Sequence, residues 1–119
     1  MKKTLIVGAS PNSDRYAFKA TEMLKDYKHE VYAFGLKKGN IGDTQIQTDW
    51  PENKDFDTIT LYIGPQNQPD YYDKIIHLNP KRVIFNPGTE NYEFENLLLK
   101  NNIEAIEACT LVMLTTNQY

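Results

Sequence analysis

Residues 4–10 read TLIVGAS, and this stretch decides the fold. Its first four residues form a nearly continuous apolar run that stops at Gly8, which is typical of a strand covered on both faces. Similar short runs follow at residues 31–34, 58–63, 83–85 and 103–106. The second and third runs end at Gly35 and at Gly64-Pro65, which break regular backbone structure. The chain is therefore expected to contain about five short strands.

Between these runs apolar residues recur every three or four positions, which predicts helices at residues 16–27, 66–79 and 91–100. Asp14 or Ser13 is expected to cap the first helix, and Pro69 suits the first turn of the second. Residues 36–57 have no period and are read mostly as loop, with Trp50 as one large apolar anchor. Residues 109–113 fit either a last helical turn or a short strand.

Strands that alternate with helices predict right-handed parallel crossovers. We therefore expect an α/β protein: a doubly wound parallel sheet of about five strands, in the order 3-2-1-4-5, with helices on both faces. Ligands of such sheets bind at the carboxyl edge, where the strand order reverses. The expected order places that point between the first and fourth strands. No repeat or linker divides the chain, so residues 1–119 are expected to be a single domain.

The composition limits the kind of protein and its compartment. The 119 residues are 40% hydrophobic and 24% charged, with a net charge of −3, which fits one soluble domain and argues against a nucleic-acid binder. A single cysteine cannot form an internal disulfide, and no clustered Cys/His spacing indicates a metal site. The apolar run near the start is too short for a secretion signal, and no stretch approaches a membrane span. We expect a cytoplasmic protein that does not contact membranes.

Two loops of turn-forming residues follow the first and fourth strands, at residues 8–13 and 86–89. Gly8 lets the backbone approach a ligand closely, and Ser10 adds a hydroxyl. The next helix points its unpaired N–H groups and positive dipole end at the same crevice, which favours an anion. The alternative is that a strand-to-helix turn needs Gly and Pro for its own geometry.

The first loop is not a dinucleotide fingerprint, because Ser10 and Ser13 stand where that pattern has glycines. Lys37 and Lys38 follow the second strand, where an NAD enzyme usually has an acidic residue. Two lysines there suit a phosphate on the ribose, and Arg15 offers a further phosphate contact. All three are equally compatible with an ordinary solvated surface.

Candidate catalytic residues are few. His29 and His77 are expected at the amino edge of the sheet, away from the crevice, in structural roles. No carboxylate pair or Ser-His-Asp set falls at the crevice, so no catalytic residue is predicted. Cys109 follows the fifth strand and is either a buried small apolar residue or a thiol near the functional edge.

Four segments together resemble a known family. They are LIVGASP at residues 5–11 with Arg15, EVYAF at 30–34 before Lys37 and Lys38, Ile41-Gly42, and Asn86-Pro87-Gly88. The sequence resembles, over nearly its whole length, the small bacterial and archaeal CoA-binding proteins. These are single Rossmann-like domains similar to the CoA-binding part of the succinyl-CoA synthetase α subunit.

The resemblance implies a set of ligand-binding residues. Gly8, Ala9 and Ser10, with Pro11 beside them, would cradle the pyrophosphate; Arg15 and Lys37 or Lys38 would meet the nucleotide phosphates; Gly64, Pro65, Asn86, Pro87 and Gly88 would line the pantetheine path. The chain departs from the family at three places. It has Phe34-Gly35-Leu36 where Val-Asn-Pro is frequent, lacks Trp-x-Gln-x-Gly after the fourth strand, and has Ala108 where a basic residue commonly precedes the cysteine.

The expected function is binding of coenzyme A or an acyl-CoA, as a binding or regulatory module without catalysis of its own. One alternative is a small NADP-dependent or other nucleotide-dependent enzyme in which Lys37 and Lys38 hold the ribose phosphate. Another is an interaction protein with a vestigial crevice. The expected partner is a small nucleotide ligand, and self-association or a protein partner stays open.

Overall fold

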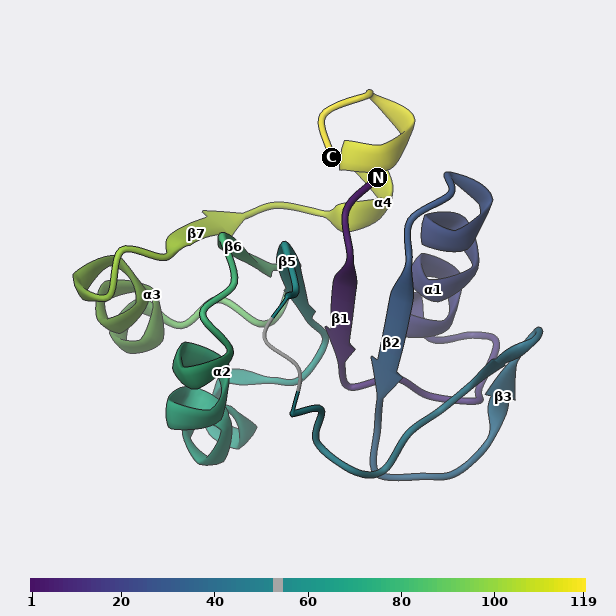
Figure 1. Ribbon diagram of the computed structural model, residues 1–119, viewed down its shortest axis with the longest axis horizontal. Coiled ribbons are helices and arrows are strands. Elements are labelled where there is room, and N and C mark those ends of the chain that lie inside the picture. Colours follow the sequence, from purple (N-terminus) through teal and green to yellow (C-terminus); the bar gives the residue numbers. More distant parts are fainter. Residues whose placement is uncertain (53–54) are drawn as a thin grey trace.

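The central sheet has five parallel strands in the order β2-β1-β5-β6-β7 (Figure 1). The strands are β1 (Thr4–Val7), β2 (Val31–Phe34), β5 (Thr58–Leu61), β6 (Arg82–Phe85) and β7 (Glu104–Glu107). The structure is a computed structural model that describes residues 1–52 and 55–119. It confirms the predicted fold class, an α/β Rossmann-like sheet of five parallel strands.

Helices cover both faces of the sheet, as expected. They are α1 (Tyr16–Asp26), α2 (Tyr72–Leu78), α3 (Tyr92–Lys100) and α4 (Thr110–Thr115), with the short 3₁₀ helices η1 (Pro65–Asn67) and η2 (Pro69–Tyr71). On one face Ile6 packs with α1 and α4 residues such as Leu24 and Leu114. On the other, Leu5 and Val7 pack with residues of α2 and α3. This alternation follows from the two-residue period of a strand.

Two expected elements differ in detail, and one that the sequence left open between helix and strand is now assigned. The helix expected at 66–79 is split into η1, η2 and α2, because Pro65 and Pro69 each begin a new turn and cannot donate to a preceding one. The segment after the last strand is helical, with Cys109 at the N-cap of α4. The loop at 36–57 contains a small hairpin of β3 (Asn40–Ile41) and β4 (Thr44–Gln45); its residues 53–54 lie outside the described residues.

The expected strand order 3-2-1-4-5 is wrong, because the third strand, β5, pairs with β1 and β6. All four residues of β5 are fully buried, whereas Val31 and Tyr32 at the start of β2 are partly exposed. A central place suits β5 because the Thr58 and Thr60 hydroxyls find hydrogen-bond partners there, on Arg82 and Asn86 of the neighbouring β6 segment. The order therefore reverses between β1 and β5.

The expected caps of α1 are also wrong. The N-cap residue is Arg15, and no side chain accepts a hydrogen bond from the first turn. The polar side chains before α1 form hydrogen bonds within the loop instead. Ser10 Oγ accepts from the Asn12 amide, and Asn12 Oδ1 accepts from the Asp14 amide. The first amides of α1 are consequently left uncapped.

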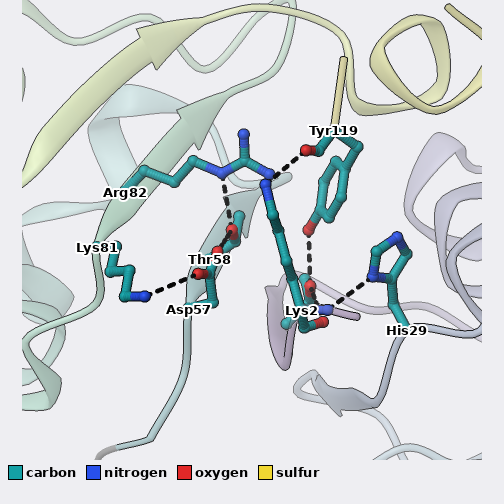
Figure 2. A network of polar contacts seen from close by, with 8 residues as sticks. Lys2, His29, Asp57, Thr58, Lys81, Arg82 and Tyr119 are labelled. Carbon is teal, nitrogen blue, oxygen red and sulfur yellow. Dashed lines mark hydrogen bonds and ion pairs between the residues drawn. The ribbon is translucent and has the colours of Figure 1, made fainter. Parts of the chain in front are cut away.

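A polar network, which we call the amino-edge network, ties the chain together at the amino ends of the strands (Figure 2). Arg82 is 8% exposed; its Nε donates to Thr58 Oγ1 at 2.8 Å, and its guanidinium lies 4.5 Å from the Tyr119 ring centre. The Tyr119 hydroxyl shares a 2.6 Å hydrogen bond with Thr4 Oγ1. The Lys2 amide donates to His29 Nδ1 at 2.9 Å. His29 therefore lies at this edge, as predicted.

None of the described helices has both the length and the apolarity needed to cross a membrane.

Candidate functional site

A crevice of about 570 Å³, here called the central crevice, lies at the carboxyl edge of the sheet. It is formed by the loops after β1, β5 and β6, together with the start of α1 and Lys37. Of the residues predicted from the sequence it contains Gly8, Ser10, Arg15, Lys37, Gly64, Pro87 and Gly88. Four separate stretches of chain, which follow β1, β2, β5 and β6, thus meet at the point where the strand order reverses. Ligands of such sheets bind at this point.

The amides of the first loop are only partly free. Gly8 N and Ala9 N both donate to the Phe34 carbonyl oxygen, at 3.0 and 2.8 Å. The Ala9 side chain is buried in the apolar cluster beneath the loop and is absent from the crevice lining. Gly8 has φ +103°, and a Cβ there would lie 2.9 Å from Ile63 Cγ2, so this position requires glycine. The role of Gly8 is close backbone approach, and its amide is already used.

The unpaired donors lie a few residues further on. Among residues 1–52 and 55–119, the amides of Ser10, Tyr16 and Ala17 have no hydrogen-bond partner. Tyr16 and Ala17 open α1, which has no acidic residue in its first turn, and all three residues line the crevice. The positive end of the α1 dipole therefore faces this space without a counter-charge from its own first turn.

The crevice carries two cations and one carboxylate. Arg15 and Lys37 are exposed and line it from the segments after β1 and β2. In the described part of the chain neither side chain forms an ion pair. Asp14 supplies the negative charge. The two cations outnumber the one carboxylate, and the unpaired α1 amides add further positive potential. The crevice therefore favours a ligand with more than one negative charge.

Besides Ala9, four predicted residues stand outside the crevice lining: Pro11, Lys38, Pro65 and Asn86. Pro11 packs against Gly39, where an added Cβ would approach Pro11 Cβ to 2.7 Å, so Pro11 anchors the loop to the 36–57 segment. Lys38 is exposed away from the crevice, and Pro65 begins η1. Asn86 is 2% exposed and lines a neighbouring cavity.

The wall formed by the β5 and β6 loops is held by a buried amide that sequence reasoning missed. Gln68 is fully buried; its Nε2 donates to the carbonyl oxygens of Ile63, at 3.0 Å, and Thr89, at 2.7 Å. Its Oε1 accepts from Asn91 Nδ2 at 2.9 Å. A glutamine in an irregular segment carries no periodic signal, so only the structure identifies it. The other crevice residues missed are Asp14, Tyr16, Ala17, Tyr62 and Thr89.

Smaller hollows adjoin the central crevice on either side. The β2-side hollow, about 260 Å³, shares Gly8 with the crevice and is bordered by Phe34, Leu36 and Tyr71 among others. The α4-side cavity, about 220 Å³, is lined by Tyr16, Tyr62, Asn86, Pro87, Cys109 and Leu111. Tyr16, Tyr62 and Pro87 also line the crevice. Burial raises the pKa of the Tyr62 phenol, so this wall stays uncharged.

The potential catalytic residues do not gather here. His29 lies in the amino-edge network, and His77 borders a separate hollow beside Trp50. Cys109 is a half-buried free thiol in the α4-side cavity. Within the described residues no cluster of His, Cys, Asp and Glu is arranged to hold a metal ion.

Comparison with known proteins identifies solved structures with the same fold. A solved structure described as an uncharacterized protein is 51% identical, with a TM-score of 0.97 over 100% of this chain and 98% of that one. A conserved hypothetical protein from Pyrococcus furiosus (24% identity, TM-score 0.82, 94% and 98% coverage) and a hypothetical protein from Pyrococcus horikoshii OT3 (22%, 0.83, 93% and 80%) share the fold. No curated protein matches. Residues 2–115 match the family described as "CoA binding domain", and the chain therefore belongs to that family.

Proposed function

We propose that this protein binds coenzyme A or an acyl-CoA in the central crevice, with the ligand's diphosphate at Ser10 and the first turn of α1. The observation that carries the proposal is the order of three adjoining spaces at one sheet edge. The β2-side hollow is mostly apolar, with Asn67 and Asp70 at its border. The central crevice carries Arg15 and Lys37 against one carboxylate, Asp14, and the α4-side cavity has no charged residue in its lining. Coenzyme A has the same order of parts: a flat adenine, phosphates, and a mostly uncharged pantetheine arm.

The phosphates would be held by donors from two sides. The amides of Ser10, Tyr16 and Ala17 are unpaired within the described residues and face the crevice, and a helix N-terminus favours a phosphate. Arg15 and Lys37 would neutralise the remaining charge. Lys37 follows the strand that also borders the β2-side hollow, so we assign it to the 3′-phosphate of the ribose.

The pantetheine arm would pass between Gly64 and Pro87 toward the α4-side cavity. Both residues line the crevice, and Pro87 also lines that cavity. The Gln68 hydrogen bonds fix the loops that carry these residues, so this path is formed before a ligand arrives.

We propose binding without catalysis. The titratable side chains that line the crevice are Asp14, Arg15, Tyr16, Lys37 and Tyr62, a set without an imidazole. Acyl transfer usually requires a nucleophile beside a general base. Incubation with an acyl-CoA should therefore release free thiol no faster than buffer does.

The binding test is isothermal titration calorimetry of the purified protein with CoA, dephospho-CoA, NADP and ATP. CoA should bind saturably and more tightly than the other three, with dephospho-CoA weakened by loss of the Lys37 contact. Ser10→Asp sets a negative charge against the diphosphate and should weaken CoA binding at least about ten-fold. Asn102→Asp adds the same charge in the exposed turn before β7, at the opposite edge, and is the matched control.

Each outcome has a defined meaning. Unchanged CoA affinity in Ser10→Asp would remove the loop from the site. Tighter binding of NADP than of CoA would favour a nucleotide-dependent enzyme, and no saturable binding by any of the four would favour a pure interaction protein.

A further inference from the structure

The α4-side cavity is a mostly apolar side cavity of the central crevice. Its walls come from the start of α1, the ends of β5 and β6, and the turn into α4. None of its six lining residues is Asp, Glu, Lys, Arg or His. A phosphate or a carboxylate would therefore lose its hydration here without gaining a counter-charge.

The one amide in this wall is already fully engaged. Asn86 Nδ2 donates to Thr60 Oγ1 at 2.6 Å and to the Leu61 carbonyl oxygen at 2.8 Å. Its Oδ1 accepts from the Thr110 amide at 2.9 Å. Asn86 thus joins β5, β6 and α4 and leaves no side-chain donor free for a ligand. Tyr62 adds one buried hydroxyl that has no hydrogen-bond partner among the described residues. The lining is otherwise mostly apolar.

The size of the cavity limits its occupant. An apolar cavity of about 150 Å³ in a protein core holds a benzene ring, and this cavity is about 220 Å³. A short branched or aromatic acyl group fits this volume. A long straight chain exceeds this volume, so it has to extend beyond the cavity or distort the walls.

We propose that the α4-side cavity binds the acyl group of a short-chain or aromatic acyl-CoA, so that the protein prefers such thioesters to free CoA. This proposal rests on the proposed function, because the shared residues Tyr16, Tyr62 and Pro87 link the cavity to the crevice assigned to the phosphates and pantetheine. Cys109 and Leu111 contribute soft apolar contacts at the far side.

The test measures the dissociation constants of CoA and of acetyl-, isobutyryl-, benzoyl- and palmitoyl-CoA by calorimetry. Affinity should rise about four-fold for each added methylene that the cavity encloses. We expect isobutyryl- or benzoyl-CoA to bind about ten-fold or more tightly than CoA, and palmitoyl-CoA to gain nothing over them. Equal affinity across the series overturns the acyl pocket and leaves the proposed function standing. Affinity that rises steadily to palmitoyl-CoA also overturns it, because the chain would then lie on an open surface.

A pair of variants on one helix locates the effect. Leu111→Trp fills the cavity and should bring the ratio of the CoA and isobutyryl-CoA dissociation constants close to one. Val112→Trp places the same ring on the neighbouring residue, which is 56% exposed and outside the cavity, and should keep the wild-type ratio. Loss of the ratio in Val112→Trp, or its persistence in Leu111→Trp, contradicts the assignment. Thermal melts report whether each variant folds. If Leu111→Trp does not fold, the affinities of the wild-type protein across the acyl-CoA series decide whether the cavity binds the acyl group. Failure of CoA itself to bind would instead overturn the proposed function.

Discussion

The two edges of the sheet use positive charge in opposite ways. At the amino edge Lys3 pairs with Asp55 at 2.7 Å and with Glu30 at 3.6 Å, and Arg82 is buried against Thr58 and the Tyr119 ring. At the carboxyl edge Arg15 and Lys37 are exposed, with no ion pair in the part of the chain that the structure describes. The comparison teaches that cations at one edge stabilise the fold, while those at the other stay available to a ligand.

The largest expected effect comes from the buried cation of the amino-edge network. Arg82→Ala removes the hydrogen bond to Thr58 and the contact with the Tyr119 ring, which should lower the free energy of unfolding by about 2–3 kcal/mol. Urea denaturation measures this loss. CoA affinity, measured by calorimetry on the folded variant, should stay at the wild-type value.

Arg82→Met is the matched control because it keeps the apolar stem and removes only the polar head, so it should cost less than alanine. A fall in CoA affinity in either variant would contradict the division of roles between the edges.

The reverse experiment removes the two free cations of the crevice. Arg15→Gln combined with Lys37→Gln should weaken CoA binding about 30-fold, at about 1 kcal/mol for each exposed charge. The free energy of unfolding should change by less than about 0.5 kcal/mol, since neither side chain supports the fold. Lys81→Gln, which removes an exposed amino-edge lysine 3.8 Å from Asp57, is the control and should leave affinity unchanged. An equal loss of affinity in the control would show that CoA affinity depends only on the net charge of the protein, and not on Arg15 and Lys37 in particular.

The smallest effect concerns pH and the imidazole of the amino-edge network. Burial, and then the nearby positive charges of the amino terminus, Lys2 and Arg82, hold the pKa of His29 below its usual 6.5. The unfolded chain therefore takes up a proton first as pH falls, so stability is complete above pH 6.5 and declines as pH drops through the lowered folded value.

Urea denaturation at pH 7.5 and 5.5 should show this decline in the wild type and a smaller one in His29→Gln. His77→Gln removes an exposed imidazole from α2 and should keep the wild-type decline. An identical slope in the wild type and His29→Gln would remove His29 from the network's energetics.

Much of the fold could be read from local patterns, because each strand is a short apolar run and most helices have a clear apolar period. The strand order could not. Runs such as Thr58–Leu61 and Val31–Phe34 look alike in sequence, and what makes β5 central is that Arg82 and Asn86, 24 and 26 residues away from their threonine partners, satisfy its hydroxyls. That is long-range information which no local period carries.

In the candidate site, too, some features could be predicted from local sequence and others depend on distant residues. Gly8, Ser10 and Arg15 were predictable because a glycine turn between a strand and a helix is a local signal. Whether an amide is free depends on a distant partner, and the Phe34 carbonyl accepts from Gly8 and Ala9. Because the Gly8 and Ala9 amides hold the loop against β2, they are not available to an anion. The predicted anion site therefore lies nearer to Ser10 and α1. Whether these residues bind CoA stays a prediction.

Gln68 has a consequence for the kinetics of ligand uptake. Because one buried amide joins the loops after β5 and β6 and also reaches Asn91, this wall loses its conformational entropy when the chain folds. An incoming molecule meets a surface that needs no search for its bound shape, so ordering on this side should add nothing to the activation barrier for association. Any slow adjustment during binding would then belong to the residue 10–15 turn across the crevice.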